Sequence, residues 1–252
     1  MKSTWFGNRH RYDFAKLVNE SDYGLTGWDK FSGFIKMAVA PLKQACHKMI
    51  HGELDQSIED EFEKTRRQFK YPDRMAMAMG CLTMALEERA EDFLGSVMSE
   101  WGQNDVKWRG QCFTPSCLSE LMGQMIIGDM KPVDGQTLMI QEPACGAGSM
   151  IIGASETLKR NGFYPWHYHW HAIDVDWRCC AMTYIQTTLL GIPCVVIHGN
   201  ALSLEITSVS RNLISILHPE KKTKRLVDSS VSHDDNHRDG SYVQGFLFEG
   251  VS

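Results

Sequence analysis

Hydrophobic positions recur at helical spacing through the N-terminal half of the chain. Between residues 30 and 50 they repeat every three or four positions around Pro41, which predicts a helix that the proline kinks or divides. Residues 54–69 are charged with sparse apolar positions and predict a surface helix. From Met75 to Trp101 the apolar residues follow one face, which predicts a single long helix.

The second half of the chain alternates short apolar runs with helical stretches. Strands are predicted at residues 138–142, near 170–175 and at 194–197, and helices over 149–160 and from about 177 to 190. This alternation is typical of an α/β fold in which helices cover both faces of a parallel sheet.

The patterns divide the chain into three parts. Residues 1–109 form an N-terminal helical region, and residues 110–205 carry the strands and helices of a partial doubly wound sheet. Residues 206–252 are polar and charged, and most of this tail is expected to be mobile.

Composition points to a folded protein of a reducing compartment. Hydrophobic residues make up 43% of the chain, and the eight cysteines include no CxxC pair, which favours a cytoplasmic protein over a disulfide scaffold. The N-terminus has no apolar signal core, and no stretch approaches the roughly 20 apolar residues of a membrane span. We therefore expect no membrane partner.

Charge alone does not indicate a nucleic-acid-binding protein. The formal net charge is −5, and the basic clusters are small, at Lys64–Arg67 and Lys221–Arg225. A protein that grips DNA over a broad face carries a basic stripe, so we interpret both clusters as solvated surface.

Three histidines at alternate positions, His167, His169 and His171, share one face of a predicted strand. Such a set can bind a metal ion, but no carboxylate or thiolate partner stands at ligand spacing. We interpret the three residues as a polar strand edge beside aromatic residues, and predict no metal site.

The segment from Gln141 to Ser149 joins a predicted strand to a predicted helix through a glycine turn. This arrangement brings a ligand close to the bare backbone at a helix N-terminus. Gly146 and Gly148 allow that approach because they carry no Cβ atom. A tight turn alone uses glycine as well, so the pair by itself is a weak signal.

Asp174 ends the second predicted strand, 26 residues after Gly148. In dinucleotide-type folds an acidic residue at about this distance accepts hydrogen bonds from ribose hydroxyls. A carboxylate suits this role because it only accepts. Asp176 is predicted to cap the helix that begins at Trp177.

Three sequence elements together resemble one enzyme family. They are Glu-Pro-Ala-Cys-Gly-Ala-Gly-Ser at residues 142–149, Phe-Thr-Pro at 113–115 and Asp-Val-Asp at 174–176. This combination resembles the S-adenosylmethionine-dependent DNA adenine-N6 methyltransferases, and in particular the modification subunits of type I restriction systems. The resemblance covers about residues 85–205. It implies a Rossmann-like methyltransferase sheet, S-adenosylmethionine as the cofactor and DNA as a partner.

The resemblance also implies roles for single residues. Phe113 to Pro115 would line the methionine end of the cofactor, although Thr114 and Pro115 alone predict a capped helix start. Asn200 stands where relatives carry an aspartate that accepts a hydrogen bond from the adenine amino group, and a neutral amide accepts more weakly. The expected cofactor-binding residues are Phe113, Thr114, Pro115, Glu142, Pro143, Ala144, Cys145, Gly146, Gly148, Asp174 and Asn200.

The catalytic motif of that family is missing from this sequence. The motif is Asn/Asp-Pro-Pro-aromatic, and none of the eight prolines are adjacent, so no catalytic residue is assigned. A broken gene, a split enzyme completed by another chain, and a protein that lost its chemistry all remain open. We expect the chain alone to bind the cofactor weakly and to leave DNA unmethylated. The alternative is a non-catalytic interaction or regulatory module of a restriction-modification complex.

Overall fold

The computed structural model describes residues 9–101 and 114–219. Five helices precede the sheet: α1 (Arg9–Asn19), α2 (Gly27–His51), α3 (Gln56–Arg66), α4 (Asp73–Glu88) and α5 (Phe93–Trp101). The remaining elements are α7 (Ser116–Ile127), β1 (Leu138–Glu142), α8 (Ser149–Arg160), β2 (Tyr168–Asp174), α9 (Trp177–Leu189), β3 (Cys194–Asn200), β4 (Glu205–Arg211) and α10 (Leu213–Leu217).

The four strands form one sheet in the order β1-β2-β3-β4. β1 pairs with β2 and β2 with β3 in parallel, whereas β4 runs antiparallel to β3. The α/β fold class predicted from the sequence is therefore confirmed, with the addition of one antiparallel strand.

The helices α8 and α9 lie on the same face of the sheet. Side chains of both helices share a core cluster with Tyr168, Trp170 and Val196 from the strands. The opposite face holds a smaller cluster around Ile173, Val195 and Ile197, and no helical residue belongs to it. The expected second helical layer is thus not seen among the described residues, because successive right-handed crossovers in one direction put their helices on one side.

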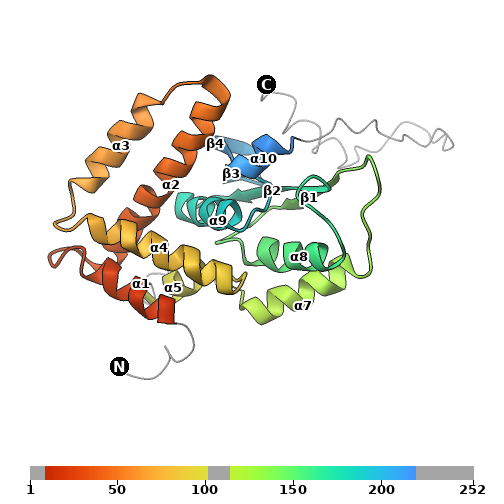
Figure 1. Ribbon diagram of the computed structural model, residues 1–252, viewed down its shortest axis with the longest axis horizontal. Coiled ribbons are helices and arrows are strands. Elements are labelled where there is room, and N and C mark those ends of the chain that lie inside the picture. The colour runs from red at the N-terminus through yellow and green to blue at the C-terminus, as the bar shows by residue number, and fades with distance from the viewer. Residues whose placement is uncertain (1–8, 102–113, 220–252) are drawn as a thin grey trace.

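Helix α9 lies between the N-terminal helices and the sheet (Figure 1). Its residues Cys179, Met182 and Ile185 belong to the main core cluster with Phe14, Phe31 and Phe34 from α1 and α2. Because neighbours surround it, α9 is buried over ten consecutive residues, 178–187. Helix α9 therefore packs against the helical region on one side and, through Cys180 and Tyr184, against the sheet on the other.

Two predictions about the helical region need correction. Residues 9–19, for which no helix was predicted, form α1. At Pro41, where a kink or a division was predicted, the helix is not divided, since α2 continues through the proline. The predicted helix from Met75 to Trp101 is broken after Glu88, because the Asp92 carboxylate accepts a hydrogen bond from the Gly95 N–H at 2.8 Å and starts α5 as a new helix.

The polar tail also begins later than predicted. Residues 206–217, which were expected to belong to it, contribute most of β4 and all of α10. The sequence of β4 is polar because all seven of its residues are partly or fully exposed to solvent, and its strand conformation depends on pairing with β3. The basic cluster at 221–225 and the rest of the tail lie outside the described residues.

Within residues 9–101 and 114–219, no helix combines the length and the hydrophobicity that crossing a lipid bilayer requires.

Candidate cofactor site

Three of the predicted site residues stand at the ends of neighbouring strands. Glu142 ends β1, Asp174 ends β2 and Asn200 ends β3. Because these strands are parallel, their carboxyl ends lie at the same end of the sheet. Open α/β sheets bind ligands at this end.

The glycine turn between β1 and α8 uses backbone conformations that favour glycine. Gly146 has φ 53° and Gly148 has φ 96°. A Cβ atom on Gly148 would also stand 3.1 Å from the Thr183 hydroxyl oxygen of α9. The two glycines therefore satisfy the backbone requirement expected for close approach of a ligand.

Helix α8 begins directly after this turn, and no side chain caps it. The N–H groups of its first turn have no partner within the helix, and together with the helix dipole they favour a negatively charged group. The uncapped N-terminus of this twelve-residue helix thus lies at the end of the sheet that carries Glu142 and Asp174.

Asp174 is hydrogen-bonded to the glycine turn. Its carboxylate accepts from the Gly146 N–H at 2.9 Å and from the Asp176 N–H at 2.9 Å. Bonds from backbone N–H groups to a carboxylate are charge-assisted and hold it firmly. As predicted, Asp176 caps α9 by accepting from the Arg178 N–H at 3.0 Å.

Glu142 stands beside Asp174 at the end of β1 and is partly buried. Its carboxylate accepts a weak hydrogen bond from the Ala144 N–H at 3.3 Å. Burial raises the pKa of Glu142, and the negative charge of Asp174 adds to that rise. The two carboxylates make this end of the sheet an acceptor-rich site.

Cys145 has a structural role in the turn. Burial raises the pKa of its thiol well above the ordinary cysteine value, so the group stays protonated. The side chain is a small apolar member of the buried cluster that also includes Ile151 and Tyr184, and we assign it no chemical role.

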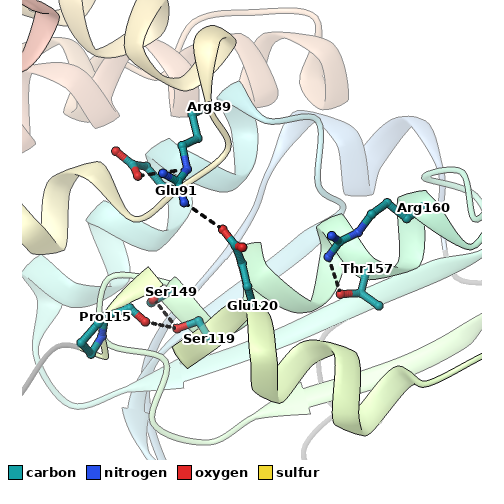
Figure 2. Close-up of polar contacts among 8 residues, drawn as sticks. All are labelled: Arg89, Glu91, Pro115, Ser119, Glu120, Ser149, Thr157 and Arg160. Carbon is teal, nitrogen blue, oxygen red and sulfur yellow. Dashed lines mark hydrogen bonds and ion pairs between the residues drawn. The ribbon is translucent and has the colours of Figure 1, made fainter. Parts of the chain in front are cut away.

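The Thr114–Pro115 segment lies next to the start of α8. The Ser149 hydroxyl donates to the Thr114 carbonyl at 3.0 Å and lies 2.6 Å from the Ser119 hydroxyl oxygen, as Figure 2 shows for the two serines. The predicted helix start is one residue off, because Pro115 occupies the capping position and Thr114 does not cap. Phe113 lies outside the described residues.

Helices α7 and α8 cross at very close range. A Cβ atom on Gly153 would stand 2.7 Å from the Ser119 backbone, and one on Gly123 would stand 2.8 Å from Ala154. Arg89 adds a link from the N-terminal helices, since its guanidinium lies 3.2 Å from the Glu120 carboxylate (Figure 2). These contacts fix the Thr114–Pro115 segment relative to the glycine turn.

Gln186 of α9 also fixes the turn, and the sequence analysis did not identify it. Its fully buried amide donates to the Ala147 carbonyl at 2.7 Å and to the Asp92 carboxylate at 3.0 Å, and accepts from the Leu94 N–H at 3.0 Å. A glutamine amid apolar residues of a predicted core helix was the available signal, because buried amides need partners.

Asn200 does not present its amide oxygen to a ligand. That oxygen accepts from the Leu202 N–H at 2.9 Å and from the Ser203 N–H at 3.3 Å, which closes a turn after β3. An amide oxygen has two lone pairs, so its expected bond to an adenine amino group competes with this turn.

The histidine prediction was wrong about the edge of the sheet. His169 and His171 are buried on β2, which is an inner strand between β1 and β3. The ring of His167, before the strand, accepts from the Tyr164 N–H at 3.1 Å. Among the residues that the structure describes, no group of three or more metal-binding side chains occurs.

Comparison with solved structures gives three similar chains. They are a protein described as a class I S-adenosylmethionine-dependent methyltransferase from Listeria monocytogenes (TM-score 0.46, 12% identity, 78% of this chain and 55% of that chain), the modification subunit of a type I restriction enzyme from Vibrio vulnificus (0.45, 11%, 80% and 58%) and the methyltransferase subunit of a type I restriction-modification system from Streptococcus thermophilus (0.36, 10%, 73% and 56%). The chain thus spans little more than half the length of these proteins.

No curated protein matches the chain. The family model described as N-6 DNA Methylase matches residues 89–219, which include the glycine turn, all four strands and α7 to α10. This match extends over more than half of the chain, and the chain belongs to the N-6 DNA methylase family.

Proposed function

We propose that the chain binds S-adenosylmethionine where β1, β2 and β3 end. The observation that carries this proposal is the Asp174 carboxylate, held by the Gly146 N–H at 2.9 Å beside two glycines with positive φ. A fixed acceptor next to open backbone suits a ligand that combines a ribose with a charged amino-acid end.

Each group has a distinct task in this proposal. Asp174 accepts hydrogen bonds from the ribose hydroxyls, and Gly146 and Gly148 let the cofactor approach the backbone. The uncapped start of α8 attracts the cofactor carboxylate. The Thr114–Pro115 segment, next to the start of α8, lines the methionine end.

Five other predicted residues complete the pocket as proposed. Glu142 supplies a second acceptor at the end of β1 and Pro143 shapes the start of the turn. Asn200 lies toward the adenine, where its amide nitrogen is the group that the turn after β3 leaves available. Ala144 and Cys145 contribute backbone and packing.

We further propose that the chain takes part in methyl transfer to the N6 atom of adenine in DNA, within a cytoplasmic restriction-modification complex. It supplies the cofactor-binding half, and another polypeptide segment supplies the Asn/Asp-Pro-Pro-aromatic motif that this sequence lacks. In support, β1 pairs only with β2 among the described residues, so a further strand can add to its other edge.

The test is calorimetry of the folded chain with S-adenosylmethionine and S-adenosylhomocysteine. We expect binding that Asp174→Asn weakens by about tenfold or more, because hydrogen bonds to a charged acceptor are lost. The matched control is Asp129→Asn, an exposed carboxylate after α7, which should bind as the wild type does. Absence of heat with both ligands would overturn cofactor binding.

The activity is tested separately with adenine-containing DNA and radiolabelled cofactor. We expect no methylation by the chain alone and methylation once the partner segment is added. Robust methylation by the chain alone would contradict the division of labour proposed above.

A second candidate function is a non-catalytic interaction module of the same kind of complex. It is favoured by the apolar side chains that α7 exposes: Leu118, Leu121, Met122, Met125 and Ile126. Partner binding that Asp174→Asn leaves unchanged, in a chain that gives no heat with the cofactor, would favour this alternative.

A further inference from the structure

A cavity of about 440 Å³ lies between the helices α2, α3 and α9 and the strands β3 and β4. The elements that surround it are seen at the upper left and centre of Figure 1. It is lined on α9 by Trp177, Cys180, Ala181 and Tyr184, whereas Thr183 and Gln186 of the same helix contact the glycine turn. The cavity and the candidate cofactor site are therefore on different sides of α9.

Much of the cavity wall is apolar. Val39 and Ala40 of α2, Ile58 and Phe62 of α3 and Val196 of β3 line it. Together with the rings of Trp177 and Tyr184, they suit a small molecule with an aromatic or aliphatic body, because such pockets gain most of their affinity from buried apolar surface.

The polar groups of the wall are mainly hydrogen-bond donors. The Lys43 ammonium lies 6.0 Å from the centroid of the Tyr184 ring and makes no hydrogen bond or ion pair within the described part of the chain. Burial lowers the pKa of Lys43, while the charge of Glu61 acts in the opposite direction. This cation is partly desolvated without a paired anion, which costs free energy until one binds.

A second cation stands at the rim. The Lys36 ammonium lies 5.4 Å from the centroid of the Trp177 ring and 3.9 Å from a Glu61 carboxylate oxygen. The Glu61 side chain is 69% exposed, so water screens this pair and it contributes little. Two cations against one exposed carboxylate leave the cavity positive.

Strand β4 adds two hydroxyl groups. Ser208 and Ser210 both line the cavity, opposite His198 and Val196 of β3 in the register. Neither hydroxyl has a hydrogen-bond partner among residues 9–101 and 114–219. The His198 ring, by contrast, lies 3.1 Å from the Val175 carbonyl oxygen and is already engaged.

We propose that this cavity is a binding site for a small organic anion with an aromatic or apolar body. The anionic group is held by the Lys43 ammonium and the Ser208 and Ser210 hydroxyls, and the body packs against the apolar wall. The site is separate from the proposed methyl-donor site, and its lining groups do not include the proposed cofactor-binding residues.

The probe for this proposal is 2-naphthoate, with 2-naphthamide as its neutral counterpart of the same shape. Binding of both to the full chain is measured by ligand-observed NMR and calorimetry. We expect 2-naphthoate to bind about tenfold more tightly than the amide, because a charge-assisted bond replaces a neutral one. Equal affinity, or binding of neither compound, would overturn the proposal.

Substitution locates the contact. Lys43→Met keeps the apolar stem and should remove the preference for the carboxylate while the amide binds as before. Lys159→Met, on the far helix α8, is the matched control, since its side chain is 75% exposed and the preference should persist. A preference that survives Lys43→Met would refute the assignment.

A second variant and a competition experiment complete the test. If Lys43→Met does not fold, Ser208→Ala combined with Ser210→Ala replaces it, with a weaker preference of about threefold expected for lost neutral donors. S-adenosylhomocysteine should not displace 2-naphthoate. Displacement would mean that the probe occupies the cofactor site, and would contradict a separate cavity.

Discussion

The two edges of the sheet are built in opposite ways. At one edge, β4 adds an antiparallel strand whose residues are mostly polar or exposed, and α10 follows it. At the other edge, β1 has no second partner among the described residues, and Met139 is 40% exposed. Helix α7, which packs on α8, also exposes apolar side chains, with Met125 exposed by 76%.

The two edges differ in how well they are protected from pairing with other chains. A polar antiparallel strand protects an edge from pairing with other chains, whereas an apolar strand and helix invite it. The unpaired edge of β1 fits the proposed function, because the proposed partner segment would continue the sheet from β1. Four measurements test this contrast, in order of decreasing expected effect.

The largest effect is expected where α7 meets α8. Gly153→Ala should lower the free energy of unfolding by about 3 kcal/mol, because its Cβ atom would stand 2.7 Å from the Ser119 backbone. Gly80→Ala in α4 is the control, since nothing lies within 4 Å of its Cβ position. That change should stabilise the chain by up to about 1 kcal/mol. Equal effects in chemical denaturation would contradict the close crossing.

The second measurement tests the edge of the sheet that β4 forms. Asn212, fully buried, accepts from the Cys194 N–H at 3.1 Å and donates to the Ile192 carbonyl at 2.7 Å. Asn212→Ala should cost about 2 kcal/mol, because it leaves buried backbone groups without partners. Asn161→Ala, which removes an exposed bond to the Gly128 carbonyl, should cost less than about 1 kcal/mol. A reversed order would mean that β4 is held by something else.

The third measurement follows pH at the end of β1. Because burial raises the pKa of Glu142, the folded chain keeps this proton longer than the unfolded chain. The free energy of unfolding should fall as pH rises from the ordinary glutamate pKa, about 4.3, through the raised value. Glu142→Gln should lack this fall, so its stability relative to the wild type increases with pH. Parallel curves for the two proteins would refute the shift.

The smallest effect is expected on the exposed face of α7. Met125→Lys should change the free energy of unfolding by less than about 0.5 kcal/mol, because the side chain is exposed. It should also reduce self-association at high concentration, measured by analytical ultracentrifugation. Ile127→Lys, at a buried position of the same helix, should be strongly destabilising instead. Unaltered self-association of Met125→Lys would show that this face of α7 does not mediate contacts between copies of the chain.

The glycine turn could be predicted from the sequence because its determinants are local. Strand 138–142 and helix 149–160 are found at those positions, since an apolar run, two glycines and an amphipathic stretch each favour their own conformation. The position of Asp174 at the end of β2 was also predicted, from its place after an apolar run and its distance from Gly148 along the chain. Its bond to the Gly146 N–H adds the tertiary contact.

Elements that depend on distant partners could not be predicted in this way. β4 is a strand because β3 offers it an edge, although its own sequence is polar. The role of Gln186 requires three segments, around Asp92, Ala147 and α9, to meet. Asn200 occupies the expected position, yet its amide oxygen is taken up by the turn after β3.

The contact of Gly123 and Gly153 has a consequence for how this region tolerates change during evolution. A one-residue insertion or deletion inside α7 would rotate a larger side chain into a space that accommodates only a hydrogen atom. Changes of length should therefore accumulate in the connections before and after α7, while the helix itself keeps a constant number of residues.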